Sequence, residues 1–415
     1  MMHTLLGVMV VAVAGLIMGS GAWPFKLMRK FQFEHWWFIG MLVGLIIMPW
    51  AIMLMGCPGA LEGLRAVPAS AIIKANLFAC GWGIANVLCG LCFVRIGMAL
   101  TGAILSGLGV SVGAIVPMVF KGSGLFKGAA DLNSPAGLTV LVAVAVMLLG
   151  VMLASLAGFG RDRELKKLQA TSGGFMGGLL MAAAAGLLST GIAFSYVYSQ
   201  DPIAANLSMI RPASTITVAI EENEELSGQR EVRPDGTIDL PGVGPVSVAG
   251  LNARLASERI QEQLAASGIM KSSTVRIDTG SIVVTFAVFA VSLLSGAMVN
   301  IGYAAYLLTR NKSWHVFTQS WKEIGLAVVI GVNISLATTL MGKGMLLLGT
   351  LGASVGWGIQ QAMQMTGSQA VGFISGEWRG VAGRPRLQMY LAIAILIVAA
   401  SIMAYSNTLP KYWSK

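Results

Sequence analysis

Ten apolar runs, each long enough to cross a lipid bilayer, limit what this chain can fold into more than any other feature. A transmembrane helix needs about 20 predominantly apolar residues. Only 11% of the residues here are charged, whereas soluble domains average roughly 25%. We therefore expect an all-α polytopic membrane bundle of ten transmembrane helices, placed near residues 3–22, 36–56, 70–93, 97–119, 136–158, 174–198, 281–308, 323–348, 354–375 and 387–406.

Basic residues between the runs predict which side of the membrane each connector faces. Cytoplasmic connectors carry an excess of Lys and Arg, and here the excess lies in connectors one, three, five, seven and nine. Both termini and the segment after the sixth run should then face outward, to the periplasm of an inner-membrane protein. The basic residues follow the first run instead of preceding it, so we expect a retained helix and not a cleaved signal. The residues concerned are Lys26, Arg29, Lys30, Arg95, Arg161, Arg163, Lys166, Lys167, Arg310, Lys312, Lys322, Arg379, Arg384 and Arg386.

The net charge of +10 is distributed in a way that argues against a nucleic-acid partner. Residues 199–280 hold 11 of the 18 acidic and 7 of the 28 basic residues, which leaves a net +14 on the rest of the chain, nearly all in short connectors. This pattern sets membrane orientation. The sequence also offers no nucleophile–base pair, no phosphate loop and no metal-ligand spacing among its four cysteines. We expect neither an enzyme nor a bound metal or cofactor.

Two of the runs share a short pattern. The sequence AVAGLI at residues 12–17 parallels AAAGLL at residues 183–188. Five spans separate the two, so the second copy would run in the opposite direction. Opposed repeats with a substrate site between them are a recurrent transporter plan. We expect two inverted five-helix repeats, with helices 1–5 and 6 in residues 1–198 and helices 7–10 with a C-terminal tail in residues 281–415.

Residues 199–280 differ in character and predict a small inserted α/β soluble domain. Residues 216–220 alternate like a strand, and Pro234-Asp235-Gly236 is a turn signal before another strand. Residues 250–266 form an amphipathic helical pattern, and residues 274–277 read as a last strand. The segment holds a small domain within a membrane protein.

The motifs of this domain closely resemble the polysaccharide-export domain of outer-membrane capsule export proteins. They are Glu225-Leu226-Ser227-Gly228, the run 232–240, Gly242-Val243-Gly244 and Val248-Ala249-Gly250-Leu251. The resemblance implies a periplasmic domain that contributes to ring assembly. Two roles stay open: a packing module tethered to the membrane, or a domain that binds a glycan or protein partner or associates with its own copies.

The membrane part resembles the L-rhamnose–proton symporter family of the drug/metabolite transporter superfamily. The resemblance implies ten spans in two five-helix repeats and the movement of a sugar with a proton; the inserted domain departs from the family pattern. It is carried, in order along the chain, by Pro24-Phe25-Lys26, Arg29, Lys30, Glu34, Trp37, Pro49-Trp50-Ala51-Ile52, Trp82-Gly83-Ile84, Asn86, Gly90-Leu91, Arg95, Gly97-Met98, Gly186, Ser189, Gly191, Phe194, Asn300, Gly302, Glu377-Trp378 and Gly383-Arg384-Pro385.

A polar stripe on the ninth run is the first candidate for the sugar site. Sugar hydroxyls need amide or hydroxyl partners, and polar amides that face lipid would be costly. The alternative is hydrogen bonding between packed helices. At helical spacing the stripe comprises Trp357, Gln360, Gln361, Gln364 and Ser368. On other runs the same space could be lined by Trp82, Asn86, Ser189, Ser195, Asn300, Asn333 and Thr339.

Ionisable groups within the runs are scarce. No Asp or Glu lies within any of the ten, since Glu34, Glu323 and Glu377 are at their cytoplasmic edges, so coupling to protons follows from the resemblance alone. Lys343 lies deep in the eighth run and is the candidate coupling residue, although its side chain could also reach the outer interface. We expect a secondary carrier for a rhamnose-like sugar. The alternative is a membrane-anchored component of polysaccharide export or glycan sensing.

Overall fold

The computed structural model describes residues 2–57, 59–96, 98–119, 130–165, 175–220, 223, 225–270, 273–349 and 352–410. The chain divides into two compact units. The first comprises Met1–Met48, Lys74–Tyr198 and Ser292–Lys415; the second comprises Pro49–Ile73 and Ser199–Val291. Lys166 and Lys167, both considered for orientation, lie outside the described residues.

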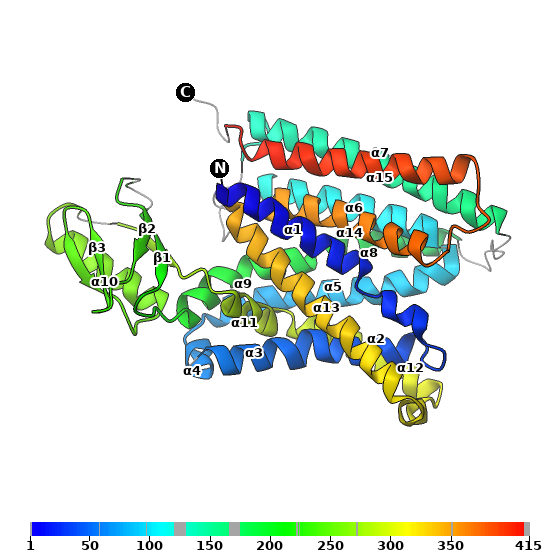
Figure 1. Ribbon diagram of the computed structural model, residues 1–415, viewed down its shortest axis with the longest axis horizontal. Helices are drawn as coiled ribbons and strands as arrows, with labels where there is room; N and C mark the ends of the chain where they lie inside the picture. The colour runs from blue at the N-terminus through cyan, green and yellow to red at the C-terminus, as the bar shows by residue number, and fades with distance from the viewer. Residues whose placement is uncertain are drawn as a thin grey trace. The chain divides into compact units, whose positions relative to one another are not determined.

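Helices make up the first unit (Figure 1). Two of them, η2 and η6, are short π-helical segments, and α5 and α9 continue into the second unit. The helices are α1 (Met2–Ser20), η1 (Trp23–Leu27), α2 (Phe33–Met41), η2 (Leu42–Ile47), α5 (Ala69–Ile96), α6 (Met98–Val119), α7 (Pro135–Glu164), α8 (Phe175–Ser189), α9 (Gly191–Leu207), α12 (Leu294–Arg310), η4 (Trp314–Gln319), α13 (Trp321–Leu347), η6 (Gly352–Gly356), α14 (Trp357–Ile374) and α15 (Arg384–Ser406).

Seven helices among the described residues are long and apolar enough to cross a membrane, and an eighth span arises if α11 and α12 count as one. The described part of every expected run is mainly helical. α14 carries four glutamines and is not one of these seven helices. The chain is thus a multi-pass helical protein with seven or more candidate spans.

Two of the expected runs contain a break. Thr190 separates α8 from α9, and α9 continues to Leu207, beyond the expected end of its run at 198. α11 and α12 meet at an angle of 59°. At that bend, Asn76 of α5 accepts a hydrogen bond from the backbone N–H of Ser295 (2.9 Å). Ser195 Oγ of α9 donates to the Ser292 carbonyl (2.9 Å). Side chains of other helices therefore satisfy the backbone groups that the bend releases.

Close helix crossings at glycines organise the first unit. α1 lies against both α13 and α14, while α7 and α15 run side by side (Figure 1). A Cβ atom at Gly15 or Gly19 of α1 would overlap backbone carbonyls of α14. Such small residues allow membrane helices to approach closely. The main apolar core fills the space between α6, α7, α14 and α15, with residues such as Val110, Met147, Ile359, Leu396 and Met403.

Antiparallel strands and short helices make up the second unit. One sheet has the order β2-β1-β5, and β3 pairs with β4 in a separate hairpin. β1 alternates exposed and buried residues as expected, with Ile216, Val218 and Ile220 inside. The elements are α3 (Met48–Gly56), α4 (Ala60–Arg65), β1 (Thr215–Ile220), β2 (Gly228–Glu231), β3 (Thr237–Leu240), β4 (Gly244–Ser247), α10 (Ala253–Ala266), β5 (Val275–Asp278) and α11 (Ile282–Ser292).

The expected turn and amphipathic helix of this domain are both present. Gly236 has φ +85°, a left-handed conformation that favours glycine. Asp235 accepts hydrogen bonds from the backbone and hydroxyl of Thr237, and these bonds lower the pKa of its carboxyl group. Asn252 caps α10 by accepting from the Leu255 N–H (2.8 Å). Ile260 and Leu264 of α10 are fully buried in the core of the strands.

Candidate functional site

The polar stripe of α14 does not face a single neighbour. Trp357 and Gln360 are buried, Gln361 and Gln364 are half-buried, and Ser368 is exposed. The indole Nε1 of Trp357 donates to the Gly109 carbonyl of α6 (2.9 Å). Gln360 Nε2 donates to Gln364 Oε1 within α14 (3.0 Å). Trp357 therefore joins two helices, and the two glutamines hold each other.

Three of the expected site residues gather at Gly109 of α6. A Cβ atom on this glycine would lie 2.8 Å from Ser189 Oγ of α8 and 3.9 Å from Gln361 Nε2 of α14. The Trp357 indole takes the space beside Gly113, one turn further along α6. Ser189 Oγ donates to Gly186 O in its own helix (2.7 Å), so its oxygen can still accept. This group, which we call the Gly109 cluster, combines an aromatic ring, an amide and a hydroxyl.

Gln360 carries an unsatisfied polar atom. Its Oε1 is buried and receives no hydrogen bond from the described residues, although its Nε2 is paired with Gln364. A buried acceptor without a donor costs roughly 1–3 kcal/mol. This oxygen can therefore accept a hydrogen bond from a hydroxyl group or a water molecule.

A second polar group lies between α5 and α12. Asn86 Nδ2 donates to Asn300 Oδ1 (3.3 Å), and Asn300 Nδ2 donates to the Gly296 carbonyl (2.8 Å). Trp82 is packed at the same glycine, since a Cβ there would lie 3.0 Å from Trp82 Cε3. Asn300 is fully buried. This is the interhelical bonding that the sequence offered as the alternative to a sugar contact.

Asn333 and Lys343 of α13 complete the expected set. Asn333 Nδ2 donates to the Gly21 carbonyl just beyond α1 (3.0 Å). Lys343 is half-buried. Thr339, on the same helix, is buried and its hydroxyl has no partner among the described residues. The expected residues thus fall into three groups, which are the Gly109 cluster with its α14 neighbours, the α5–α12 pair and the positions on α13.

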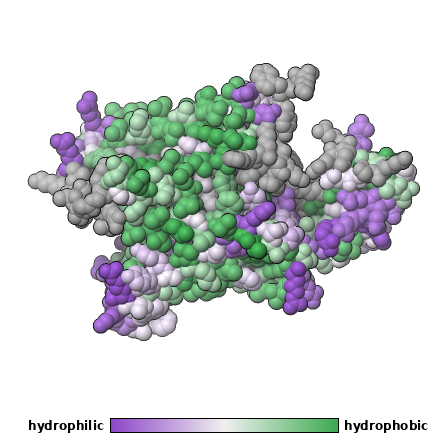
Figure 2. Space-filling model, turned by 180° about the vertical axis from the view of Figure 1, so that it is seen from behind, coloured by the Kyte–Doolittle hydropathy of each residue, from purple (hydrophilic) through white to green (hydrophobic). Residues whose placement is uncertain are grey.

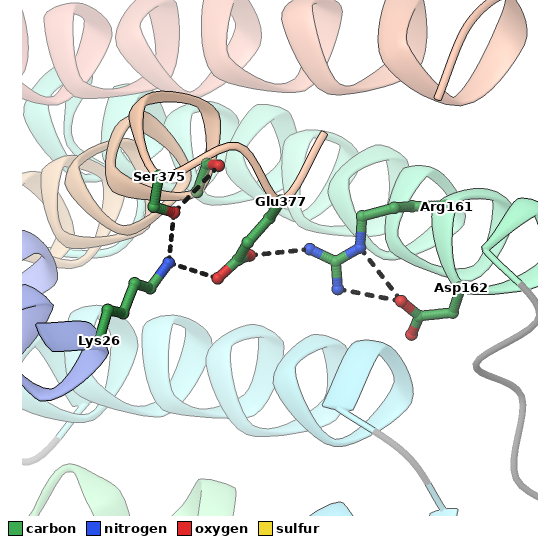
Figure 3. Close-up of polar contacts among 6 residues, drawn as sticks. Lys26, Arg161, Asp162, Ser375 and Glu377 are labelled. Atoms are coloured by element: carbon green, nitrogen blue, oxygen red, sulfur yellow. Dashed lines mark hydrogen bonds and ion pairs between the residues drawn. The ribbon is translucent and has the colours of Figure 1, made fainter. Parts of the chain in front are cut away.

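An ion-pair network that the sequence did not indicate lies where η1, α7 and α14 end (Figure 3). Lys26 of η1 pairs with Glu377 and contacts Ser375 Oγ (2.5 Å). Arg161 of α7 pairs with Glu377 Oε2 (3.2 Å) and Asp162 Oδ1 (3.0 Å). Glu377 therefore bridges two cations from two different helices.

Stacked side chains extend this network along α15. The Arg161 guanidinium lies 5.5 Å from the Trp378 ring centre. Phe373 stacks on Trp378 (5.0 Å) and on Tyr390 (5.1 Å). The Arg386 guanidinium lies over the Tyr390 ring, 5.8 Å from the ring centre. Cation–π contacts of this kind contribute roughly 0.5–1 kcal/mol when exposed and more when desolvated. We call Lys26, Arg161, Glu377 and Trp378 the ionic latch.

The distance along the chain explains why the sequence did not reveal the latch. Lys26 and Glu377 are 351 positions apart, and Arg161 and Glu377 are 216 apart. The one available signal was an acidic residue within a basic connector, next to a tryptophan. That signal does not identify partners.

Contacts bring four of the five basic connectors to one end of the first unit. The latch joins connectors one, five and nine. Lys30 Nζ donates to the Gln319 carbonyl (2.8 Å), which adds connector seven. At the other end, Ala136 N donates to the Pro410 carbonyl (3.2 Å). These connectors lie together, as one shared side of the membrane requires.

Comparison with known proteins gives two family matches. Residues 2–220 match the family model described as L-rhamnose-proton symport protein (RhaT). Residues 204–279 match the family described as polysaccharide biosynthesis/export protein. No solved structure matches the chain.

Curated relatives agree with the first match. The L-rhamnose-proton symporter of Yersinia pestis bv. Antiqua (strain Antiqua) is 29% identical over 172 residues, which is 41% of this chain and 49% of the relative. The symporter of Yersinia pseudotuberculosis serotype O:1b (strain IP 31758) has the same identity over the same length, with 48% of the relative covered. The chain spans about half the length of these relatives. Because the first family model covers more than half of the 415 residues, and because the helices form a multi-pass membrane protein, this chain belongs to the L-rhamnose-proton symport protein family.

Proposed function

We propose that this protein is a secondary transporter that moves a rhamnose-like monosaccharide across the inner membrane by alternating access, coupled to protons. The observation that carries the proposal is the family match over residues 2–220, supported by relatives named as L-rhamnose-proton symporters. Transport of this kind needs no covalent chemistry by the protein. Binding, orientation and a change of access are sufficient.

The proposal includes ten spans in two inverted five-helix repeats. In such an arrangement spans 1 to 4 correspond to spans 6 to 9. Gly15 and Gly186 occupy equivalent places in the two sequence copies. A Cβ at Gly15 would meet the Gln360 carbonyl of α14, in span 9, and one at Gly186 would lie 3.2 Å from the Ile104 carbonyl of α6, in span 4. The crossing of spans 1 and 9 thus has a counterpart in the crossing of spans 6 and 4.

A second pair of crossings follows the same relation. A Cβ at Gly44, in span 2, would lie 2.5 Å from the Gly331 carbonyl in span 8. A Cβ at Gly83, in span 3, would lie 2.9 Å from the Gly296 carbonyl in span 7. Exchange of the two halves converts one glycine crossing into the other. Both pairs support the inverted-repeat arrangement.

For the sugar site we propose the Gly109 cluster together with Gln360 and Gln364. The unsatisfied Gln360 Oε1 suits a hydroxyl donor, and the Ser189 oxygen and the Gln361 amide lie near the same α6 glycine. Four other expected residues would contribute to the sugar site because of where their helices α5, α12 and α13 lie: Trp82, Asn86, Asn300 and Asn333. Ser368 would form the exposed end of the stripe. Lys343 stays our candidate for coupling to protons.

The connectors that share one end of the first unit are proposed to face the cytoplasm. The ionic latch would then close the cytoplasmic end of the carrier in this conformation. Residues 199–280, taken as the inserted domain, and both termini would lie outside. Exchange of access would require Glu377 to release Lys26 or Arg161.

A second candidate function rests on the match of residues 204–279 to polysaccharide biosynthesis/export proteins. Under this alternative the bundle anchors a domain that binds a glycan or protein partner, or a second copy of the chain. The domain has its own apolar core, with Ile216, Ile238 and Ile260 fully buried. A separate core suits a binding module that functions beside the helices.

Uptake into proteoliposomes tests the proposed function. Purified full-length protein should accumulate labelled L-rhamnose when the lumen is made alkaline relative to the outside, and a protonophore should abolish accumulation. Uptake that does not depend on the pH gradient would support the carrier hypothesis and contradict proton coupling. Absence of both rhamnose uptake and rhamnose binding by folded protein would contradict the proposal.

A further inference from the structure

Two connectors that lie side by side form a surface rich in bases and aromatic rings. One runs from η1 to α2, and the other runs from α12 through η4 to α13. Phe31 packs edge-on against Phe317 (5.5 Å), and His35 Nε2 contacts the Ser313 carbonyl (3.1 Å). We define the basic–aromatic surface by its exposed members, which are Trp23, Phe25, Arg29, Lys30, Phe33, Arg310, Lys312, Trp314, Trp321 and Lys322.

The two acidic residues of these connectors are withdrawn from the surface. Glu323 is 6% exposed, and its carboxylate accepts from three successive backbone N–H groups, including that of Phe31 (2.7 Å). Glu34 is 5% exposed and accepts from Asn311 Nδ2 (2.9 Å). Glu323 still attracts Lys30, but neither carboxylate forms an ion pair with the other exposed bases of the described connectors. The exposed charge between residues 20–37 and 309–323 is therefore entirely positive.

Most of these bases have no acidic partner. Among the described residues, Arg29, Arg310, Lys312 and Lys322 make no ion pair, in contrast with Lys26, which is held by Glu377. Lys30 extends to a backbone carbonyl instead of a carboxylate. Like charges gathered on one surface repel one another. A surface of this kind favours an anionic partner.

Exposed tryptophans indicate what kind of anionic partner fits this surface. Trp23 is 47% exposed, Trp314 is 43% and Trp321 is 79%. Tryptophan combines an apolar ring with an N–H donor and gathers at the membrane–water interface. Figure 2 shows hydrophilic residues at the end of the first unit where α12 leads into α13, beside a hydrophobic face. The bases thus lie beside exposed tryptophan rings, an arrangement typical of residues at a membrane–water interface.

We propose that the basic–aromatic surface binds the headgroups of anionic phospholipids. Arginine can donate two parallel hydrogen bonds to a phosphodiester, while lysine acts as a point charge. The exposed rings would lie at the depth of the glycerol esters. Bases near a membrane surface are attracted to anionic lipid, and salt screens that attraction. This inference does not depend on which solute the protein transports.

Lipid-dependent stability of the full-length protein tests the proposal. The thermal midpoint of the purified chain is measured in micelles doped with phosphatidylglycerol or with phosphatidylcholine. Phosphatidylglycerol should raise the midpoint more, and the triple variant Arg29→Gln, Arg310→Gln, Lys312→Gln should lose at least half of that difference. The matched control removes three exposed bases elsewhere, through Arg233→Gln, Arg254→Gln and Arg259→Gln, and should keep it.

Three outcomes would overturn the proposal. They are a triple variant that keeps the full lipid effect, a control variant that loses as much, and inorganic phosphate at equal concentration that reproduces the effect in place of lipid. If the triple variant does not fold, the single variants Lys312→Gln and Lys322→Gln replace it. For these, native mass spectrometry should count fewer retained phosphatidylglycerol molecules than for the unchanged protein. Equal counts would contradict the proposal.

Discussion

Single polar atoms in the bundle have consequences because little water is available to replace a lost partner. Gln360 illustrates this: its Nε2 is bonded to Gln364, while its buried Oε1 accepts nothing from the described residues. Removal of Gln364 would leave both ends of the Gln360 amide without a protein partner. The two glutamines thus function as a unit in which one amide positions the other.

The substitution Gln364→Leu should weaken sugar binding while the helix is retained. Loss of one neutral hydrogen bond costs about 0.5–1.5 kcal/mol, so apparent affinity for L-rhamnose should fall several-fold. Ligand-induced thermal shift measures this directly. Gln369→Leu, a half-buried glutamine of α14 outside the stripe, is the control and should change little. Unchanged affinity in a variant with Gln360, Gln361 and Gln364 all apolar would place the sugar site elsewhere.

Two glycines of α6 give a matched test of helix packing. A Cβ at Gly113 would overlap the Trp357 indole, whereas a Cβ at Gly102 has nothing within 4 Å among the described residues. Gly113→Ala should destabilise the protein by about 1–3 kcal/mol, the usual cost of overpacking. Gly102→Ala should be neutral or slightly stabilising, because Ala favours a helix over Gly. Comparable thermal midpoints for the two variants would contradict the packing described for Trp357.

At the scale of elements, the ionic latch connects the ends of helices from both halves of the chain. Each of its ion pairs is partly exposed: the side chain of Arg161 is 17% exposed, that of Lys26 is 22% and that of Glu377 is 43%. Single exposed pairs contribute about 0–1 kcal/mol. Glu377 makes two pairs at once, so its charge holds three elements together. A carrier that alternates can break contacts of this strength repeatedly.

Glu377→Gln removes the charge that both bases share and should favour the open form of this end. A combined loss of about 1–2 kcal/mol corresponds to a 5–30-fold change in the equilibrium. A cysteine at Ser375 should accordingly react faster with a thiol reagent in the variant than in the parent protein. Arg254→Gln, which breaks the isolated Arg254–Glu258 pair of α10, is the control. Equal rates of cysteine modification in all three proteins would contradict a role of the ionic latch in opening this end.

Local patterns predicted some elements well and others poorly. β1 and α10 were predicted because alternation and amphipathic spacing are repeated over several residues. β2 and β4 have four residues each and contain Gly228, Gly244 and Pro245, so they lack such a pattern. The bend between α11 and α12 lies inside a continuous apolar run. It depends on Asn76 and Ser195 from other helices, and no local signal records those contacts.

The same limit applies to the candidate site. The sequence identified the polar stripe from its spacing, and the structure divides that stripe between a contact with α6 and a pair within α14. Spacing defines one face of a helix, but not which neighbour covers it. Ser189 and Gln361 meet at Gly109 only because α6 crosses both α8 and α14 there.

At the scale of the whole molecule, orientation is the first property to measure. In a variant with Cys57, Cys80, Cys89 and Cys92 replaced by serine, a single cysteine at Ser273 should react with an impermeant reagent added to intact cells. One at Leu165 should react only after the membrane is opened. We expect this because the basic connectors are proposed to lie together on the cytoplasmic side of the membrane. Labelling of the Leu165 position in intact cells would invert the proposed orientation.

The contribution of the inserted domain separates the two candidate functions. Residues 208–278 contain all five strands and α10 with a core of their own, so they should fold alone, with the marginal stability expected of a domain this small. The full chain can be compared with a variant in which a short flexible linker replaces this segment. If the protein is a carrier, the linker variant keeps L-rhamnose binding within about a factor of 2–3, the usual scatter of such contributions.

If the protein is instead an anchor for glycan recognition, saccharide binding should follow the excised domain. Calorimetry on the domain and thermal shift on the linker variant, each with the same set of sugars and oligosaccharides, distinguish the two cases. The helices of the first unit supply the amides of α14 and the asparagines of α5 and α12, whereas half of the exposed residues of α10 are charged and most of the others are apolar. We therefore expect monosaccharide binding to stay with the helices. Tight saccharide binding by the domain, with none by the linker variant, would contradict the carrier assignment.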